Sequence, residues 1–383
     1  MNKISRRNFA RLAAALSVAP YLGTATAEAH PLFQPLTSKP EEWPGYEKAI
    51  VIDFLASPGP FNTAERVTGL TPEMVKNAVD SGITAINLTI GGRTGPGIED
   101  FFRTMAIWER EMKMHPNALM QIQNMADLAE AKRTKRLGII YGFQDCTIMG
   151  DDLSRVEMFS SFGVRIMQLT YNVRNQFADG CLVPDDQGLN PFGHELVAEL
   201  NKQKVIVDLS HCSTKTTNDG IKASKAPVAI SHSGCKAVAD LPRSKRDEEL
   251  KMMADKGGVI GIYLMPFLVK GRAPSDEDVM MHIEHALKVC GEDHVGIGSD
   301  LSITPHNVTE EYKKSHAVFV KGRKEKGIAA PGEDENIFMF VPELNKANRM
   351  ELIADNLLKR GHKASVVEKI VGGNFARLMK EVW

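Results

Sequence analysis

The chain has 383 residues, of which 43% are hydrophobic and 25% charged, and its formal net charge is −1. These values are typical of a globular chain with one large domain or two ordinary ones. They exclude a disordered polyelectrolyte and a strongly basic nucleic-acid-binding surface. The sequence contains no run of 18 or more apolar residues, so no transmembrane helix is predicted.

The first 27 residues predict an export signal. They carry four cations and no acid, with Arg6 and Arg7 adjacent, followed by the apolar run 12–22 and the small residues 25–27. This order is typical of a signal peptide, and the paired arginines indicate the twin-arginine type. We expect cleavage near Ala27 or at Ala29, export by the twin-arginine machinery, and a periplasmic mature protein. An amphipathic surface helix is the alternative.

Residues 28–48 are rich in proline and predict an irregular N-terminal arm. From residue 49 onward, short apolar segments alternate with segments of helical composition. The predicted strands are 49–54, 83–90, 137–143, 163–170, 205–209, 227–230, 257–264 and 294–299. The predicted helices are one that begins after Thr71 and others at about 99–114, 123–135, 192–202, 213–224, 246–256 and 275–290. The alternation predicts a single α/β domain over 49–383, a (β/α)8 TIM-type barrel, with a doubly wound open sheet as the alternative.

Three segments do not belong to this alternation. The glycine-rich residues 91–97 lack the spacing of a phosphate-binding motif and are interpreted as a strand-to-helix loop. Residues 302–342 are predicted to be irregular and to cover the mouth of the barrel. Two C-terminal helices, 344–359 and 363–381, are expected to pack outside it.

Two predicted strands end at the same dipeptide, Ser210-His211 and Ser231-His232. The carboxyl ends of parallel barrel strands carry the active site in this architecture, so both imidazoles are expected at the mouth. Two neutral imidazoles with a carboxylate suit a divalent metal, most plausibly zinc, which would activate water near neutral pH. Asp300, at the end of the last strand, is the candidate proton carrier. Each histidine could instead simply end a buried strand, and Asp53, one pleat deeper in the first strand, could serve only as an anchor.

The five cysteines form no C-x-x-C pair, and their number is odd. A disulfide framework is therefore not predicted, although one bridge is compatible with an exported protein. Cys212, which follows His211, is interpreted as a small buried residue in preference to a ligand or nucleophile.

Several motifs together resemble those of the membrane (renal) dipeptidase family of amidohydrolase-like barrels. They are VIVDLSHCS at 205–213, PVAISHSGC at 227–235, DLPRSKRDEEL at 240–250, HVGIGSD at 294–300 and GGNFARLM at 372–379. The resemblance runs from about residue 50 to the C-terminus. It implies a dinuclear zinc dipeptidase on a (β/α)8 barrel, with small dipeptides as substrates, including those with a C-terminal D-residue, and with homodimers as a possible assembly.

The resemblance also assigns roles to individual residues. His211 and His232 match the two histidine ligands of the second metal, Asp300 matches the catalytic aspartate, and Arg243 matches the arginine that binds the substrate carboxylate. Four departures affect the metal centre and the substrate site: Leu55 and Ser57 stand where the family has a histidine and an aspartate of the first metal, Gln144 replaces the bridging glutamate, and Tyr171 replaces a substrate-facing histidine. We therefore expect at most one zinc per chain, bound by His211 and His232, with Gln144, Asp300 and water as candidates for the remaining ligands; a chain without zinc is the alternative.

Three functions remain open from the sequence. The first is a single-metal hydrolase of small peptides or amides, in which Asp300 carries the proton, Arg243 holds a carboxylate and Tyr171 donates to the developing oxyanion. The second is an isomerase, a lyase or a hydrolase of another small carboxylate on the same barrel. The third is a periplasmic binding protein without catalytic activity.

Overall fold

The computed structural model describes residues 45–64, 68–91 and 97–383. The chain divides into two units, residues 1–39 and 40–383, and all described residues belong to the second. The expected signal at 1–27 and the arm up to residue 44 lie outside the described residues, as does most of the glycine-rich loop.

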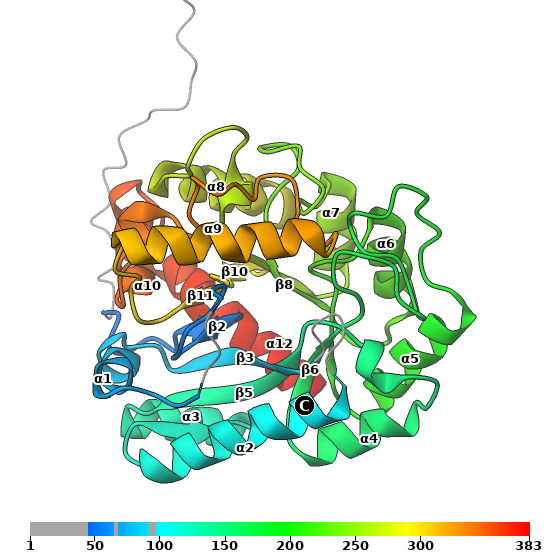
Figure 1. The fold of residues 1–383 in the computed structure, drawn as a ribbon, viewed down its shortest axis with the longest axis horizontal. Coiled ribbons are helices and arrows are strands. Elements are labelled where there is room, and N and C mark those ends of the chain that lie inside the picture. The colour runs from blue at the N-terminus through cyan, green and yellow to red at the C-terminus, as the bar shows by residue number, and fades with distance from the viewer. Residues whose placement is uncertain (1–44, 65–67, 92–96) are drawn as a thin grey trace, which may run out of the picture. The chain divides into compact units, whose positions relative to one another are not determined.

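Eight parallel strands close into a barrel (Figure 1). Strand β1 pairs with β3 on one side and with β10 on the other, which joins the two ends of the sheet, and β3 pairs directly with β5. The strands are β1 (Ile52–Asp53), β3 (Ala85–Gly91), β5 (Leu137–Phe143), β6 (Val164–Gln168), β7 (Ile206–Asp208), β8 (Ala229–Ser233), β9 (Val259–Ile262) and β10 (Val295–Ile297). Each overlaps a predicted strand, so the (β/α)8 barrel is confirmed and the open sheet is excluded.

The sequences of the strands are runs of apolar residues because both faces of each strand are buried, one against the barrel interior and one against helices. All seven residues of β5 are buried, for example. The backbone directly after β10 approaches β8 closely at Gly298, where a Cβ would lie 1.9 Å from the carbonyl oxygen of Ser231. Only glycine fits there.

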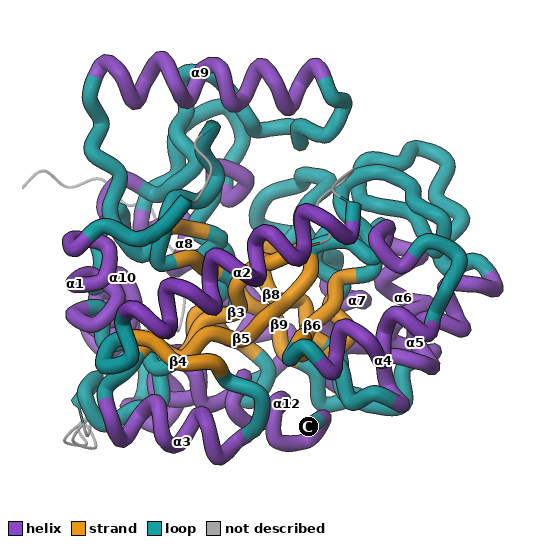
Figure 2. The backbone as a smooth tube through the Cα atoms, turned by 60° about the horizontal axis from the view of Figure 1, so that its bottom comes forward, coloured by secondary structure: helices purple, strands orange, loops and turns teal. Residues whose placement is uncertain are grey.

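Helices surround the strands (Figure 2). Helix α1 (Pro72–Asp80) begins where the sequence predicts, and its N-cap Thr71 accepts a hydrogen bond from the Met74 amide. Further predicted helices are α2 (Ile98–Met114), α3 (Met125–Thr134), α5 (Pro191–Lys202), α6 (Thr214–Ala223), α7 (Asp247–Asp255) and α8 (Asp276–Cys290). Three features of the fold were not predicted: helix α4 (Ser154–Ser161), the short strand β4 (Leu119–Gln121) beside β5, and the paired strands β2 (Ala56–Ser57) and β11 (Leu301–Ser302).

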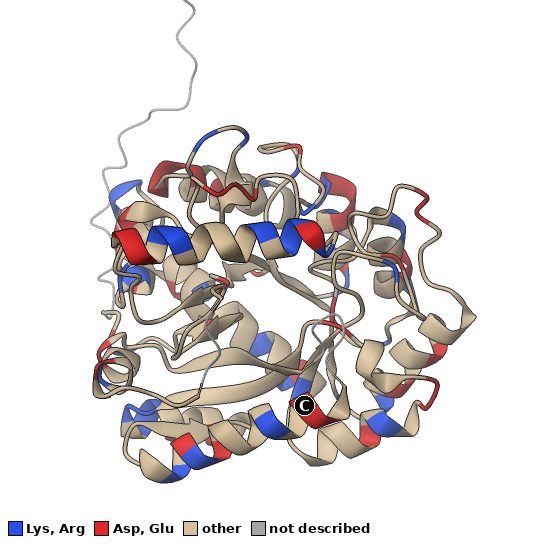
Figure 3. Ribbon diagram, viewed as in Figure 1, with Lys and Arg blue, Asp and Glu red and all other residues tan. Residues whose placement is uncertain are grey.

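The prediction that residues 302–342 are irregular is wrong. They contain α9 (Glu310–Glu325), a helix of 16 residues that starts at the N-cap Thr309. Its only buried residues are His316 and Val320, and charged residues recur along its length (Figure 3). The helix therefore lacks the apolar stripe by which amphipathic helices are recognised.

The C-terminal helices lie outside the ring of strands, as expected, but one of them covers an end of the barrel. After α10 (Arg349–Lys359), the predicted helix 363–381 is divided into α11 (Ala364–Glu368), a π-helical turn at Lys369–Gly373 and α12 (Asn374–Val382). Phe375 of α12 stacks on Phe54 with ring centroids 3.8 Å apart. Arg377 donates hydrogen bonds to the carbonyls of Gly257 and Asp293, which precede β9 and β10, so α12 closes the N-terminal end of the barrel.

Within the described ranges, no helix combines the length and the apolar character needed to cross a bilayer. The five cysteines are free, in agreement with the absence of a predicted disulfide framework.

Candidate active site at the mouth of the barrel

The two imidazoles meet at the carboxyl end of the barrel, as the sequence predicts. His232 belongs to β8 and His211 follows β7. Their Nε2 atoms are 2.9 Å apart, and both side chains are buried. Two nitrogen ligands of one zinc ion, each at about 2.0–2.1 Å from the metal, would have a similar separation. The spacing therefore fits a shared cation.

Hydrogen bonds determine which nitrogen of His211 carries the proton. The Asn172 Nδ2 donates to the carbonyl of Ile328 at 2.8 Å, which fixes the orientation of the amide. Its Oδ1 consequently faces the His211 Nδ1 at 2.6 Å and can only accept a hydrogen bond. His211 is therefore protonated at Nδ1, and its Nε2 presents a lone pair to the mouth.

His232 is fixed in the same form from inside the barrel. The Ser231 hydroxyl donates its single proton to Asp208 at 2.5 Å and so accepts from the His232 Nδ1 at 2.7 Å. Asp208 also accepts from the Ser210 hydroxyl and from the amides of Ser210 and Ser231. Burial raises the pKa of Asp208, and these four donors act against the rise. Both Nε2 lone pairs thus face each other, an arrangement that a bound cation relieves.

The electrostatic surroundings keep both imidazoles neutral. Burial lowers the pKa of His211 and that of His232 well below the usual value, and the nearby guanidinium of Arg243 lowers both further. Neutral imidazole is the form that binds metals.

Tyr171 lies directly on His211. The two rings are stacked with centroids 4.1 Å apart and an interplanar angle of 23°. The Tyr171 hydroxyl accepts a hydrogen bond from the Arg323 Nη1 at 3.1 Å, so its own proton remains available to a ligand. Arg323 comes from α9, and its guanidinium also binds Glu333 through two nitrogens. Residues 323–333, which we name the covering segment, thus lie against the mouth.

Arg243 also lines the mouth, but it is nearly fully buried, with 2% of its surface exposed. It donates to the main-chain carbonyls of Ser210 at 2.6 Å and His232 at 3.3 Å. These bonds hold the two strand ends that carry the histidines. The guanidinium is therefore fixed next to the imidazoles and does not extend freely into solvent.

Asp300 lines the same small cavity. Its φ is +61°, a left-handed conformation that Asp adopts more readily than most residues. The Asp300 amide donates to the Leu55 carbonyl at 2.8 Å, and its carbonyl accepts from the Asn62 side chain at 2.6 Å. Gln144 is buried, but its side chain makes no hydrogen bond to any residue that the structure describes, and it is not among those that line the cavity.

The residues at the positions of the first metal do not fit a metal site. Leu55 is apolar and buried, and the Ser57 Oγ accepts from the Gly59 amide at 3.2 Å. Asp53 is bound by Ser299 and Arg349, which makes it an anchor between β1 and β10. Asp145 accepts from the amides of Thr147 and Tyr171, so both of its carboxylate oxygens are already bound by the main chain.

Leu55 and Ser57 therefore offer neither an imidazole nor a carboxylate at the two positions where the family resemblance places ligands of the first metal. In the described part of the chain, no group of three or more His, Cys, Asp and Glu residues could hold a metal ion. The two imidazoles form an incomplete site for a single ion, whose remaining ligands would have to be amide, solvent or substrate oxygens. Cys212 is a small buried residue, as expected: burial raises the pKa of its thiol to about 11, and its sulfur accepts from the Thr170 hydroxyl.

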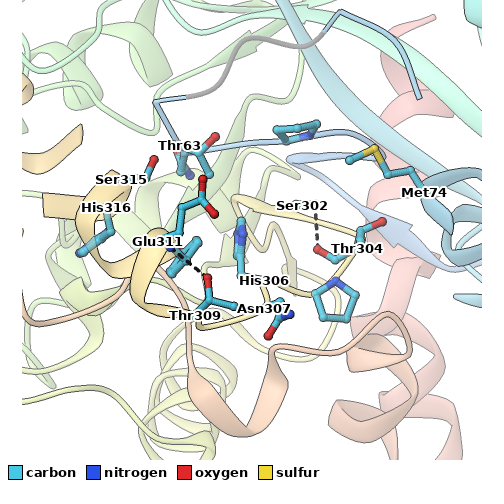
Figure 4. Close-up of a pocket in the computed structure, with 14 residues that line it drawn as sticks. Thr63, Met74, Ser302, Thr304, His306, Asn307, Thr309, Glu311, Ser315 and His316 are labelled. Atoms are coloured by element: carbon cyan, nitrogen blue, oxygen red, sulfur yellow. Dashed lines mark hydrogen bonds between the residues drawn. The ribbon is translucent and has the colours of Figure 1, made fainter. Parts of the chain in front are cut away.

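Two cavities adjoin at the mouth. The one beside His211 and Asp300 has a volume of about 10 Å³, enough for about one water molecule. A larger one of about 250 Å³ lies between the start of α9 and the loops after β2 and β11, with His306, Glu311 and Ser315 in its wall (Figure 4). Asn62 lines both cavities.

Four polar residues that line the cavity at the mouth were not among the predicted site residues: Asn62, Asn172, Arg323 and Glu333. Asn172 lies two residues after the predicted strand 163–170, and that position was a usable signal. Arg323 and Glu333 lie in a segment that has no periodic pattern, and no local feature of the sequence points to them.

Fold and site together define a class of protein: a closed (β/α)8 barrel with a histidine pair at its carboxyl end. The family model "Membrane dipeptidase (Peptidase family M19)" matches residues 61–321. The chain belongs to this family.

Individual relatives agree with the family match. Over 289 residues the chain is 27% identical to the dipeptidase tcpJ of Claviceps purpurea, which covers 74% of this chain and 60% of that protein. Over 218 residues it is 32% identical to an uncharacterised dipeptidase of Schizosaccharomyces pombe, covering 54% of this chain and 52% of that protein. The chain thus spans between about half and three fifths of the length of these curated relatives.

Among solved structures, an amidohydrolase from Pseudomonas aeruginosa is similar, with a TM-score of 0.77 and 30% identity over 88% of this chain and 98% of that one. A metallo peptidase from Rhodobacter sphaeroides, liganded with a phosphinate mimic of the dipeptide L-Ala-D-Ala, has a TM-score of 0.69 at 17% identity, covering 88% of this chain and 100% of that one. The second likeness shows the fold alone.

Proposed function

We propose that the protein is a dipeptidase-like hydrolase of small peptide or amide substrates that uses one divalent ion, zinc, in place of a pair. Family membership supports the reaction class. The single observation that supports the altered metal site is the 2.9 Å separation of the two Nε2 atoms, with no ligand set for a first metal among the residues that the structure describes.

The chain's own residues supply the remaining chemistry. A zinc ion held by His211 and His232 would polarise a substrate carbonyl. Asp300 faces the same cavity and is placed to take up and return a proton. Arg243 is held rigidly beside the imidazoles and offers positive charge to a substrate carboxylate. The Tyr171 hydroxyl, which already accepts from Arg323, can donate its proton to an oxygen that becomes negative.

Elemental analysis of the full chain after expression in zinc-supplemented medium tests this function, followed by hydrolysis of a panel of L,L- and L,D-dipeptides. We expect about one zinc per chain, with the zinc and the activity both lost in His211→Ala and in His232→Ala. The control is His115→Ala, at the end of α2, which should retain both. Two zinc ions per chain would contradict the single-ion site.

The same experiment separates the alternatives. Zinc without turnover of any dipeptide would indicate an isomerase, a lyase or a hydrolase of another small carboxylate. A chain that takes up no zinc and cleaves nothing would be a binding protein, an alternative favoured by the incomplete ligand set and by a mouth cavity of about 10 Å³.

We also propose that the protein is exported to the periplasm by the twin-arginine route. The adjacent Arg6 and Arg7 before an apolar run support this proposal. Replacing both with lysine should leave the full-length precursor in the cytoplasm, whereas the unaltered chain should be found shortened in the periplasmic fraction. Equal export of both chains would contradict the proposal.

A further inference from the structure

The two histidines of the mouth are held in different ways. His232 is fixed by Ser231 and Asp208, which both belong to barrel strands. His211 is fixed by Asn172 at its edge and by Tyr171 on its face. These two neighbours follow β6 in the loop above the barrel.

Tyr171 and Asn172 are both bound by the covering segment. The Tyr171 hydroxyl accepts from Arg323, whose guanidinium carbon is 5.7 Å from the centre of the Tyr171 ring. The Asn172 Nδ2 donates to the carbonyl of Ile328 at 2.8 Å. The two side chains that hold the His211 imidazole at its edge and on its face are therefore both bound by residues 323–333.

The covering segment is braced internally. The Arg323 Nη2 and the Glu333 Oε1 are 2.8 Å apart, and Nε also binds this carboxylate. The Glu333 side chain is fully buried, and its Oε1 accepts from the Ala330 amide at 2.8 Å. Arg323 additionally donates to the Ile328 carbonyl, the group that orients Asn172. The segment thus acts on Tyr171 and Asn172 as one unit.

We propose that Asn172 and Arg323 are positioning residues for His211: through them the closed covering segment keeps the imidazole protonated at Nδ1 and its Nε2 free for a ligand. The positioning stands on the contacts alone, and only the use of Nε2 for zinc rests on the proposed function. The proposed function adds a consequence: about 10 Å³ is too little space for a dipeptide, and Arg323 and Glu333 of the covering segment form part of the cavity wall. A movement of this segment that widened the cavity would also release His211.

The alternative state of the imidazole is defined by its neighbours. Without an acceptor at Nδ1, the proton of His211 moves to Nε2, from which it can donate to the His232 Nε2 at the observed 2.9 Å. That proton occupies the lone pair that a metal needs. Loss of a residue that orients a metal-binding histidine typically weakens metal affinity by about 10- to 100-fold.

The test is the tautomer of each imidazole, read from ¹⁵N chemical shifts of histidine-labelled, metal-free full-length protein. Signals are assigned with His211→Gln and His232→Gln. In the unaltered chain both histidines should be protonated at Nδ1. In Asn172→Ala, His211 should shift toward the Nε2–H form while His232 stays unchanged, and zinc affinity measured by chelator competition should fall about tenfold.

Two further variants separate the contacts. Asn172→Asp retains an acceptor for His211 but loses the donor to Ile328, so it should preserve the Nδ1–H form while proteolytic cleavage within 323–333 increases. Arg323→Met should mix the tautomers of His211. Arg272→Met is the control, because Arg272 also binds a carboxylate through two nitrogens, that of Asp278 at the start of α8, with 2.7 Å for each contact. It should change neither histidine.

The proposal is overturned if His211 keeps its tautomer in Asn172→Ala, if His232 changes equally, or if Arg323→Met behaves like Arg272→Met. Circular dichroism confirms that each variant is folded. If the chain binds no zinc but His211 responds as expected, the proposed function fails and the positioning holds. If zinc binds normally but His211 does not respond, the reverse applies.

Discussion

Asp53 and Arg349 form a buried ion pair: their side chains are 3.2 Å apart and are 0% and 1% exposed. The Ser299 hydroxyl is hydrogen-bonded to both of them. Burial raises the pKa of Asp53, while Arg349 and Ser299 oppose the rise. The pair stabilises the junction of β1 and β10 only as long as both partners are present.

Arg349→Met should lower the free energy of unfolding by about 3–5 kcal/mol, because it leaves a buried carboxylate without its counter-charge. The measurement is urea unfolding at pH 7. The double variant Asp53→Asn with Arg349→Met should recover part of the loss. Arg103→Met, which removes an exposed partner of Glu99, is the control and should leave stability unchanged. An equal loss in the single and double variants would show that packing, not charge, is responsible.

For individual residues, the sequence predicts where a side chain lies in the barrel better than it predicts which groups that side chain contacts. His211, His232 and Asp300 could be placed at the mouth because strand ends are visible as apolar runs that stop at a polar residue. The bonds that orient them could not, since Asn172 and Ile328 lie 156 residues apart. Arg243 shows the same limit, because its two carbonyl partners are apparent only once β7 and β8 are side by side.

Among the secondary-structure elements, α12 has the most direct influence on the barrel interior. Its Phe375, Leu378 and Met379 pack with the inward-facing residues of the strands, among them Ile52 and Ile206. A Cβ at Gly296 would lie 2.5 Å from the Phe375 ring, so strand and helix are in direct contact. The helix is therefore part of the barrel core.

Phe375→Ala should destabilise the protein by about 3–5 kcal/mol, through the loss of buried apolar surface and the cavity it leaves. The matched control is Phe102→Ala on α2, whose side chain is 38% exposed and should cost much less. Denaturant midpoints of the two variants measure the difference. Similar values for both would mean that α12 does not contribute to the core.

The elements differ in how well the sequence predicts them. Barrel strands have strong signals because burial on both faces forces apolar runs. Helix α9 has a weak signal, because half of its residues are exposed and its two buried positions are too few to set a period. The break between α11 and α12 was missed because Lys369–Gly373 keeps helical composition up to its two glycines, and only the close approach of Gly372 to the Ile50 carbonyl explains it.

The whole molecule should lose stability in mild acid. Burial lowers the pKa of His306 and that of His282 to about 4. In the unfolded chain each imidazole takes up a proton below about pH 6.5. Between these values the unfolded state binds more protons than the native state, so stability is complete above about pH 6.5 and falls as the pH decreases toward 4.

His306→Phe tests this at one position, since the ring is stacked on Phe340 at 5.5 Å and an aromatic replacement can keep that contact. Each buried histidine should contribute a slope of roughly 1.4 kcal/mol per pH unit between about pH 6.5 and 4. In urea unfolding at a series of pH values, the variant should therefore lose the contribution of one histidine to the slope of the free energy of unfolding against pH. An unchanged slope would show that His306 is protonated in the native state.

The position of α12 also has a consequence for synthesis on the ribosome. Helix α12, which closes the N-terminal end of the barrel, is translated after all eight strands. The nascent chain therefore exposes an apolar opening until residues 374–382 emerge from the exit tunnel. Chaperones that recognise such openings would have their longest opportunity at that moment. A ribosome stalled before Asn374 would thus hold a barrel whose eight strands are complete but whose N-terminal end is still open.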